Sequence, residues 1–95
     1  MPSWIEHAIF WHLYPLGFTG APIRPQIAPP LEHRLEQLTG WLDYAVELGA
    51  SALLLGPIFA SASHGYDTTD HFRIDPRLGD EADFDRLIEL ARARG

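Results

Sequence analysis

The side chains of this sequence that could do chemistry gather in one segment, residues 61–80. They are imidazoles, carboxylates and one tyrosine ring, namely His64, Tyr66, Asp67, Asp70, His71 and Asp75. A metal site could use His64, Asp67, Asp70 and His71, because histidine nitrogens and carboxylate oxygens are good metal ligands, although their spacing matches no established metal motif. A pair of carboxylates could take part in acid–base catalysis, namely Asp67 with Asp70 or with Asp75. A tyrosine beside a carboxylate and an imidazole also suits a sugar, whose ring stacks on the aromatic face while its hydroxyls bind the polar groups.

A plainer interpretation competes with these three. Asp67 and Asp70 are residues that commonly cap turns, because an aspartate side chain accepts hydrogen bonds from nearby backbone N–H groups. Ser61 and Ser63 lack the strand–elbow–helix setting of a serine nucleophile. No glycine cluster falls between a strand and a helix to cradle a phosphate. The residues alone leave the metal, acid–base, sugar and turn-capping interpretations open.

Composition narrows the function classes. The 95 residues contain no cysteine, which excludes a disulfide framework, a zinc–thiolate site and a thiol nucleophile. The formal net charge of −6 argues against a nucleic-acid partner, which needs a basic face. The apolar runs 8–14 and 50–60 fall short of the roughly 20 residues that span a bilayer. We therefore expect no membrane partner and, without a signal peptide, a cytoplasmic location.

Two strands are predicted at Ala8–Tyr14 and Ala52–Leu55. Both are apolar almost throughout, which is typical of strands covered on both faces of a parallel sheet. Phe10 and Trp11 are therefore expected in the core, and His12 is expected to be a hydrogen-bonded core histidine.

The first predicted helix spans Leu31–Leu48, where apolar residues recur at spacings of three and four. Trp41 widens this stripe and is expected in the core. Pro30 is tolerated in the opening turn, and Gly49 is expected to end the helix in a left-handed conformation. Gly40 in the middle costs about 1 kcal/mol relative to alanine.

The second predicted helix begins at Asp80, a good N-cap, with Asp83 completing a variant capping box. The order strand, helix, strand, helix indicates parallel strands with right-handed crossovers. In such units the functional groups gather in the loops beyond the carboxyl ends of the strands. Here those loops are residues 16–30 and 56–79.

These segments resemble a known family. The runs HGYDTTD at residues 64–70 and IDPRLGD at residues 74–80 resemble the segment after the second barrel strand in the α-amylase superfamily of glycoside hydrolases, glycoside hydrolase family thirteen. The run WHLYPLGF at residues 11–18 resembles that family's first strand, and LLLGPIF at residues 53–59 resembles its second. Within the family, the sequence is most similar to cyclomaltodextrinase- and neopullulanase-like members.

The resemblance implies an α/β fold in which residues 1–95 are an N-terminal fragment of a (β/α)₈ TIM barrel. The fragment would hold the first two β/α units, with parallel strands, and would be truncated before strand three. The resemblance also implies a retaining hydrolase or transglycosylase that acts on α-glucosidic bonds of starch- or maltooligosaccharide-type substrates by double displacement. The family's catalytic carboxylates follow later strands, so we name no catalytic residue and expect the chain alone to be inactive. No cofactor is implied, with calcium left open for the full-length enzyme.

By position in the motif, the resemblance implies three substrate-binding residues. Tyr66 would stack against the sugar whose bond is cut, Asp67 would bind the hydroxyls of a terminal sugar, and His64 would contact substrate at the rim. Asp70 and the turn at 74–76 would fix the shape of the loop. The expected partner is an α-glucan or maltooligosaccharide.

Two other function classes stay open. The chain could be a non-catalytic quarter-barrel module that binds sugar or associates with itself through exposed strand edges. It could also be a small metal-binding protein that uses the histidines and aspartates of residues 61–80.

Overall fold

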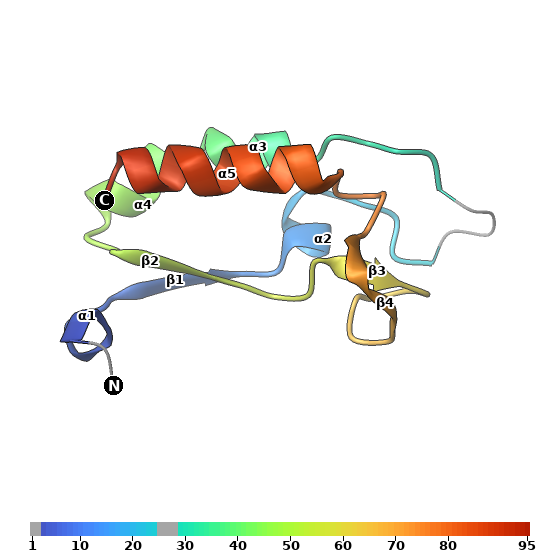
Figure 1. Ribbon diagram of the computed structural model, residues 1–95, viewed down its shortest axis with the longest axis horizontal. Helices are drawn as coiled ribbons and strands as arrows, with labels where there is room; N and C mark the ends of the chain where they lie inside the picture. The colour runs from blue at the N-terminus through green and yellow to red at the C-terminus, as the bar shows by residue number, and fades with distance from the viewer. Residues whose placement is uncertain (1–2, 25–28) are drawn as a thin grey trace.

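A computed structural model describes residues 3–24 and 29–95, so residues 25–28 of the predicted loop 16–30 lie outside the described residues. Figure 1 shows two layers, with α3, α4 and α5 along one side and two strand pairs below them. The pair β1–β2 lies under one end of the helices and the pair β3–β4 under the other, with α2 between them. In chain order the elements are α1 (Ser3–Glu6), β1 (Phe10–Leu13), α2 (Pro15–Phe18), α3 (Leu35–Thr39), α4 (Leu42–Glu47), β2 (Ala52–Leu55), β3 (Phe59–Ser61), β4 (Thr68–Ile74) and α5 (Glu81–Ala93).

The predicted parallel strand pair is confirmed. β1 and β2 run parallel in a register that pairs Phe10 with Ala52 and Leu13 with Leu55. The loops after both strands therefore leave the same edge of the sheet (Figure 1). This is the edge at which α/β proteins place their functional groups.

Among residues 3–24 and 29–95 only one face of β1 is covered, contrary to the prediction that both faces would be. Burial alternates along the strand: Phe10 and His12 are exposed, Trp11 is half-buried and Leu13 is buried. Successive side chains of a strand point to opposite faces, and the helical layer covers one of them (Figure 1). Phe10, 44% exposed, is therefore outside the core, and His12 is not a core histidine.

The single helix predicted over Leu31–Leu48 is instead two short helices, α3 and α4. The Leu35 N–H donates to the carbonyl of Leu78 at 2.8 Å, which binds the segment before α3 to a distant turn rather than to a first helical turn. At the junction the Trp41 N–H reaches back three residues to the Leu38 carbonyl at 3.0 Å. This tight turn contains Gly40, whose poor helix propensity favours a break there.

Trp41 is 43% exposed, which corrects its expected place in the core. Its ring belongs to a surface cluster with Trp11, Phe18 and Tyr44, in which contacting ring centroids lie 5.3–6.5 Å apart. Gly49 does end α4 in a left-handed conformation, with φ 87°, as predicted.

The capping box of α5 is confirmed. The Asp80 side chain accepts from the Asp83 N–H at 2.9 Å, and the Asp83 side chain accepts from the Asp80 N–H at 3.1 Å. The buried side chain of Leu87 then faces the core, which is built largely from leucines. The core residues are Leu13, Leu16, Ala21, Leu35, Leu38, Leu42, Ile74, Leu78 and Leu87.

The segment 56–79, predicted as a loop, contains the antiparallel hairpin β3–β4. Its register pairs Phe59 with Ile74 and Ser61 with Thr68, with irregularities between them. Most of β4 is exposed, and its sequence, TTDHFRI, accordingly lacks the apolar pattern by which a strand is predicted. No helix of the described residues is long and apolar enough to cross a membrane. The cytoplasmic location stays a prediction.

Candidate functional site

The three predicted binding residues lie together in the loop 62–67, which joins β3 to β4. Gly65 gives this loop its shape, because its φ of 102° is a conformation that side-chain-bearing residues rarely adopt. A Cβ at this position would also lie 3.0 Å from the Cβ of Pro57. The loop thus packs closely against Pro57, and a residue with a Cβ would be strained at this position.

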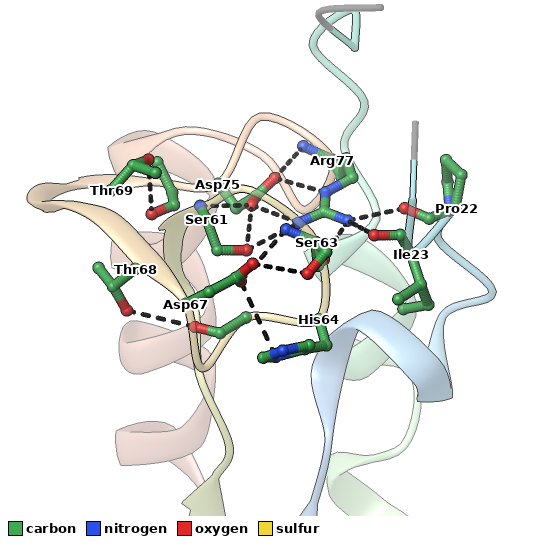
Figure 2. Close-up of polar contacts among 12 residues, drawn as sticks. Pro22, Ile23, Ser61, Ser63, His64, Asp67, Thr68, Thr69, Asp75 and Arg77 are labelled. Atoms are coloured by element: carbon green, nitrogen blue, oxygen red, sulfur yellow. Dashed lines mark hydrogen bonds and ion pairs between the residues drawn. The ribbon is translucent and has the colours of Figure 1, made fainter. Parts of the chain in front are cut away.

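The carboxylate of Asp67 is held by one residue, Ser63. The Ser63 hydroxyl donates to Oδ2 at 2.6 Å, and the Ser63 N–H donates to Oδ1 at 3.2 Å (Figure 2). The hydroxyl bond is the main reason that the pKa of Asp67 lies below its usual value. Asp67 is thus charged at neutral pH, and its side chain keeps 35% exposure through which its oxygens can accept further hydrogen bonds.

Tyr66 is 72% exposed and presents its ring at the surface. One face lies against Tyr14, with ring centroids 6.4 Å apart and an interplanar angle of 21°. The Tyr66 N–H donates to Nδ1 of His64 at 3.2 Å, and Nδ1 also lies 3.8 Å from the Asp67 carboxylate. The hydroxyl of Tyr14 donates to the His64 carbonyl, so a β1-flanking residue ties down the loop. An aromatic face, an imidazole and a carboxylate are therefore side by side.

Beneath this loop lies a buried ion pair between Asp75 and Arg77. Arg77 donates through Nε to Oδ1 at 3.0 Å and through Nη2 to Oδ2 at 2.8 Å, a two-pronged contact. Burial on its own raises the pKa of Asp75, but the hydrogen bonds and charge of Arg77 outweigh it and leave the pKa below its usual value. The hydrogen bonds that Arg77 donates to the Asp75 carboxylate in turn raise the pKa of Arg77. Both groups are therefore charged although both are almost completely buried.

The same guanidinium joins three segments of the chain (Figure 2). Its Nη1 donates to the carbonyls of Pro22, Ile23 and Ser63 at 2.7, 3.2 and 2.6 Å, and its Nη2 donates to the Ser61 hydroxyl at 2.9 Å. In the described part of the chain, no buried side-chain nitrogen or oxygen lacks a partner. Arg77 thus links the loop after β1 to the hairpin that carries the predicted site.

The structure does not assemble the acid–base pair considered for Asp67. Asp75 is engaged by Arg77, and Asp70 accepts from the Phe72 N–H two residues further on at 2.9 Å. The contact of Asp70 is a local turn of the kind expected when aspartate only shapes the backbone. For Asp70 the turn-capping interpretation is the one that the geometry supports.

The metal set considered for residues 61–80 is not assembled either. His71 faces Phe59 on the hairpin, with ring centroids 6.3 Å apart. Within residues 3–24 and 29–95, the group close enough to hold an ion is His33, Asp80 and Asp83. Its members already bind one another through hydrogen bonds: Asp80 and Asp83 form the capping box, and His33 Nδ1 lies 2.7 Å from Asp83 Oδ2. This cluster needs no ion to be satisfied.

Three residues that shape the site, Tyr14, Ser63 and Arg77, were not among the predicted binding residues. Ser63 lies in the same segment as Asp67, four positions before it, a spacing at which a serine can bond an aspartate across a tight loop. Tyr14 and Arg77 act over separations of 50 and 14 residues, for which the sequence carries no local signal.

Known proteins match this chain along its whole length. The family Alpha-amylase, described as alpha amylase, catalytic domain, matches residues 34–95. A cyclomaltodextrinase from Bacillus sp is 32% identical and neopullulanase 2 from Thermoactinomyces vulgaris is 36% identical, each covering 99% of this chain and 19% of the relative. The solved structure of cyclic alpha-maltosyl-(1→6)-maltose hydrolase from Arthrobacter globiformis superposes with a TM-score of 0.79 at 33% identity. The match covers 99% of this chain and 24% of that one.

The chain thus spans about a fifth of the length of the curated relatives that it matches. Its parallel strand pair and helical layer are consistent with part of an α/β barrel. The family match, the curated relatives and the solved structure agree with the resemblance of residues 64–80. This chain belongs to the α-amylase family of glycoside hydrolases.

Proposed function

We propose that this chain is the N-terminal portion of a retaining enzyme that hydrolyses or transfers α-glucosidic bonds of starch- or maltooligosaccharide-type substrates. Within it, the loop 62–67 binds the sugar. The observation that carries the proposal is the pairing of an exposed tyrosine ring, Tyr66, with the charged carboxylate of Asp67 in one loop. The Arthrobacter globiformis hydrolase is also known in complex with maltose, and that structure matches this chain with a TM-score of 0.76, which makes an α-linked sugar the natural candidate.

Each group suits one side of a sugar. The apolar face of a pyranose packs on an aromatic ring such as that of Tyr66. The hydroxyls donate to a carboxylate, and Asp67 has unused acceptor capacity beside its two bonds from Ser63. His64 lies at the edge of the same loop, where Nδ1 accepts from the Tyr66 N–H and Nε2 is left to meet a sugar hydroxyl.

The chain is proposed to bind rather than to cleave. Retaining glycosidases need a nucleophilic carboxylate and a carboxylic acid about 5 Å apart, with the acid protonated near neutral pH. Asp67 and Asp75 both have pKa values below the usual range, so neither suits the role of the acid. Pure chain incubated with maltooligosaccharides should release no reducing sugar.

Binding is tested by titrating maltotriose into the full chain and following backbone NMR shifts, with cellotriose as the β-linked control. We expect shifts in residues 62–67 with maltotriose and much weaker ones with cellotriose. Tyr66→Ala should abolish them. Phe72→Ala removes another exposed aromatic ring, 92% exposed on the neighbouring β4, and should leave them intact. Equal binding by the Tyr66→Ala variant would refute the proposed site.

Self-association is a second candidate function, favoured by the exposed edge of β2. β2 pairs with β1, and no other strand of the described residues pairs with it. Leu54 of β2 is exposed, and an apolar open edge promotes pairing between chains. Sedimentation velocity should show association that rises with concentration and weakens in Leu54→Lys but not in Leu48→Lys, an exposed leucine outside the strand. A single monomeric species at every concentration would remove this candidate.

A further inference from the structure

Arg77 is buried to 1% exposure, although arginine is rarely found fully inside a protein. Its guanidinium makes six hydrogen bonds, two to Asp75 and four to the surrounding loops. Neutralising the charge requires only Asp75. The remaining three N–H groups make four hydrogen bonds to oxygens of the hairpin and of the loop after β1, so they determine how these segments lie.

One of these contacts leads directly to the proposed sugar site. Nη1 of Arg77 donates to the Ser63 carbonyl at 2.6 Å. Ser63 is itself buried, and its N–H and hydroxyl are the two groups that hold Asp67 (Figure 2). A serine fixed at its carbonyl has little freedom to turn its other two polar groups. Arg77 therefore acts on Asp67 through one intermediate residue, in addition to the direct electrostatic attraction between the two charges.

We propose that Arg77 is a positioning residue for the sugar site: by holding the Ser63 carbonyl, it keeps both Ser63 donors on Asp67 and fixes the direction in which that carboxylate meets sugar hydroxyls. The inference rests on the proposed function of Asp67. It assigns Arg77 a task beyond stabilising the fold. The low pKa of Asp67, which stems first from the Ser63 hydroxyl, gives this task a spectroscopic signature.

The test follows the Asp67 carboxyl by ¹³C NMR during acid titration of the full chain. In Arg77→Lys, the single ammonium cannot reach Asp75 and Ser63 together as the planar fork does. We expect the pKa of Asp67 to rise towards its usual value and the affinity for maltotriose to fall by about tenfold, the equivalent of one misplaced charge-assisted hydrogen bond.

If Arg77→Lys folds poorly, a second variant carries the test. The double substitution Asp75→Asn with Arg77→Met removes both charges, so that no unpaired ion stays buried. It should also show a rise in the pKa of Asp67, to which the lost charge of Arg77 contributes, whereas Arg77→Lys keeps a positive charge and so isolates the effect of position. Asp75→Asn alone weakens the pair but leaves the Arg77 contact to Ser63, so it should lower the melting temperature without moving that pKa. Arg94→Lys, which alters the exposed pair with Asp43, should move neither quantity by much.

The outcomes separate the two proposals. If folded Arg77→Lys and the double variant keep the Asp67 pKa and the maltotriose affinity of the unmodified chain, Arg77 has only a structural role and the inference is wrong. If the unmodified chain does not bind maltotriose, the proposed function fails, and the titration of Asp67 still decides whether Arg77 positions this carboxylate.

Discussion

Arg77→Met breaks the buried ion pair from one side, and its effect can be worked out from the contacts. Asp75, whose side chain is 2% exposed, would lose its two guanidinium donors at 3.0 and 2.8 Å. It would keep the N–H groups of Ser61 and of residue 77. Leaving one ion of a buried pair without its partner costs about 3–5 kcal/mol. The free energy of unfolding of a domain of this size is about 5–14 kcal/mol, so the loss is a large part of it.

The pH dependence of this loss has a definite sign. In the unmodified chain the pKa of Asp75 is depressed, so its contribution to stability is present above the unfolded value near 4 and lost as pH falls through the folded value. In Arg77→Met, burial acts without the guanidinium and raises the pKa of Asp75 above the unfolded value. The folded variant then gains relative stability as the pH falls. The damage should be greatest at pH 7 and smaller near pH 4.

Thermal unfolding followed by circular dichroism measures both effects. At pH 7 the melting temperature of Arg77→Met should fall by more than about 10 °C, since each kcal/mol shifts it by about 4–8 °C in domains of this size. Arg94→Met is the matched control, because its pair with Asp43 is exposed and such pairs contribute little. A fall no larger than that of Arg94→Met, or one of equal size at pH 7 and pH 4, would refute the reasoning.

Three further predictions concern the contacts around the site. His33→Ala removes a hydrogen bond to Asp83 that raises the pKa of the histidine. Its stabilisation is therefore present below about pH 6.5 and lost as pH rises through the folded value, so the difference in melting temperature should be seen at pH 5.5 and disappear by pH 9; a constant difference contradicts this. Gly65→Ala, which puts a Cβ 3.0 Å from Pro57, should lower both the melting temperature and the maltotriose affinity, each measured by calorimetry. If both quantities equal those of the unmodified chain, the loop is not tightly packed. Tyr14→Phe removes the hydroxyl that holds the loop and should weaken maltotriose binding by about tenfold in NMR titration with little change in melting temperature; unchanged affinity would show that the tether is dispensable.

What the sequence predicted well depends on neighbouring residues. The capping box is formed by two residues only three positions apart, Asp80 and Asp83, and the left-handed conformation of Gly49 requires only the absence of a side chain. These features follow from short-range geometry, which a sequence pattern records directly. The parallel pairing of β1 and β2 follows from the order of elements.

The errors arose where distant contacts decide the structure. Periodicity alone extends the first helix back to Leu31, but the N–H of Leu35 is taken by the carbonyl of Leu78, 43 residues away. Continuous apolarity suggested two covered faces for β1, whereas the described residues place helices over one, which leaves Phe10 and His12 exposed. A sequence states which residues tolerate burial, and the arrangement of layers decides which ones receive it.

The same difference between local and distant contacts separates the predicted residues of the site from the others. Tyr66 and Asp67 could be predicted because their motif lies within one loop, and whether they bind substrate stays a prediction. Arg77 could not be predicted as part of the site, since an arginine is read as a surface residue unless acceptors are known to surround it. Those acceptors come from residues 22–23, 61–63 and 75, which meet only after the strands have paired and the hairpin has formed. The loop supplies the groups that would touch a sugar, while the geometry of those groups depends on contacts that span most of the chain.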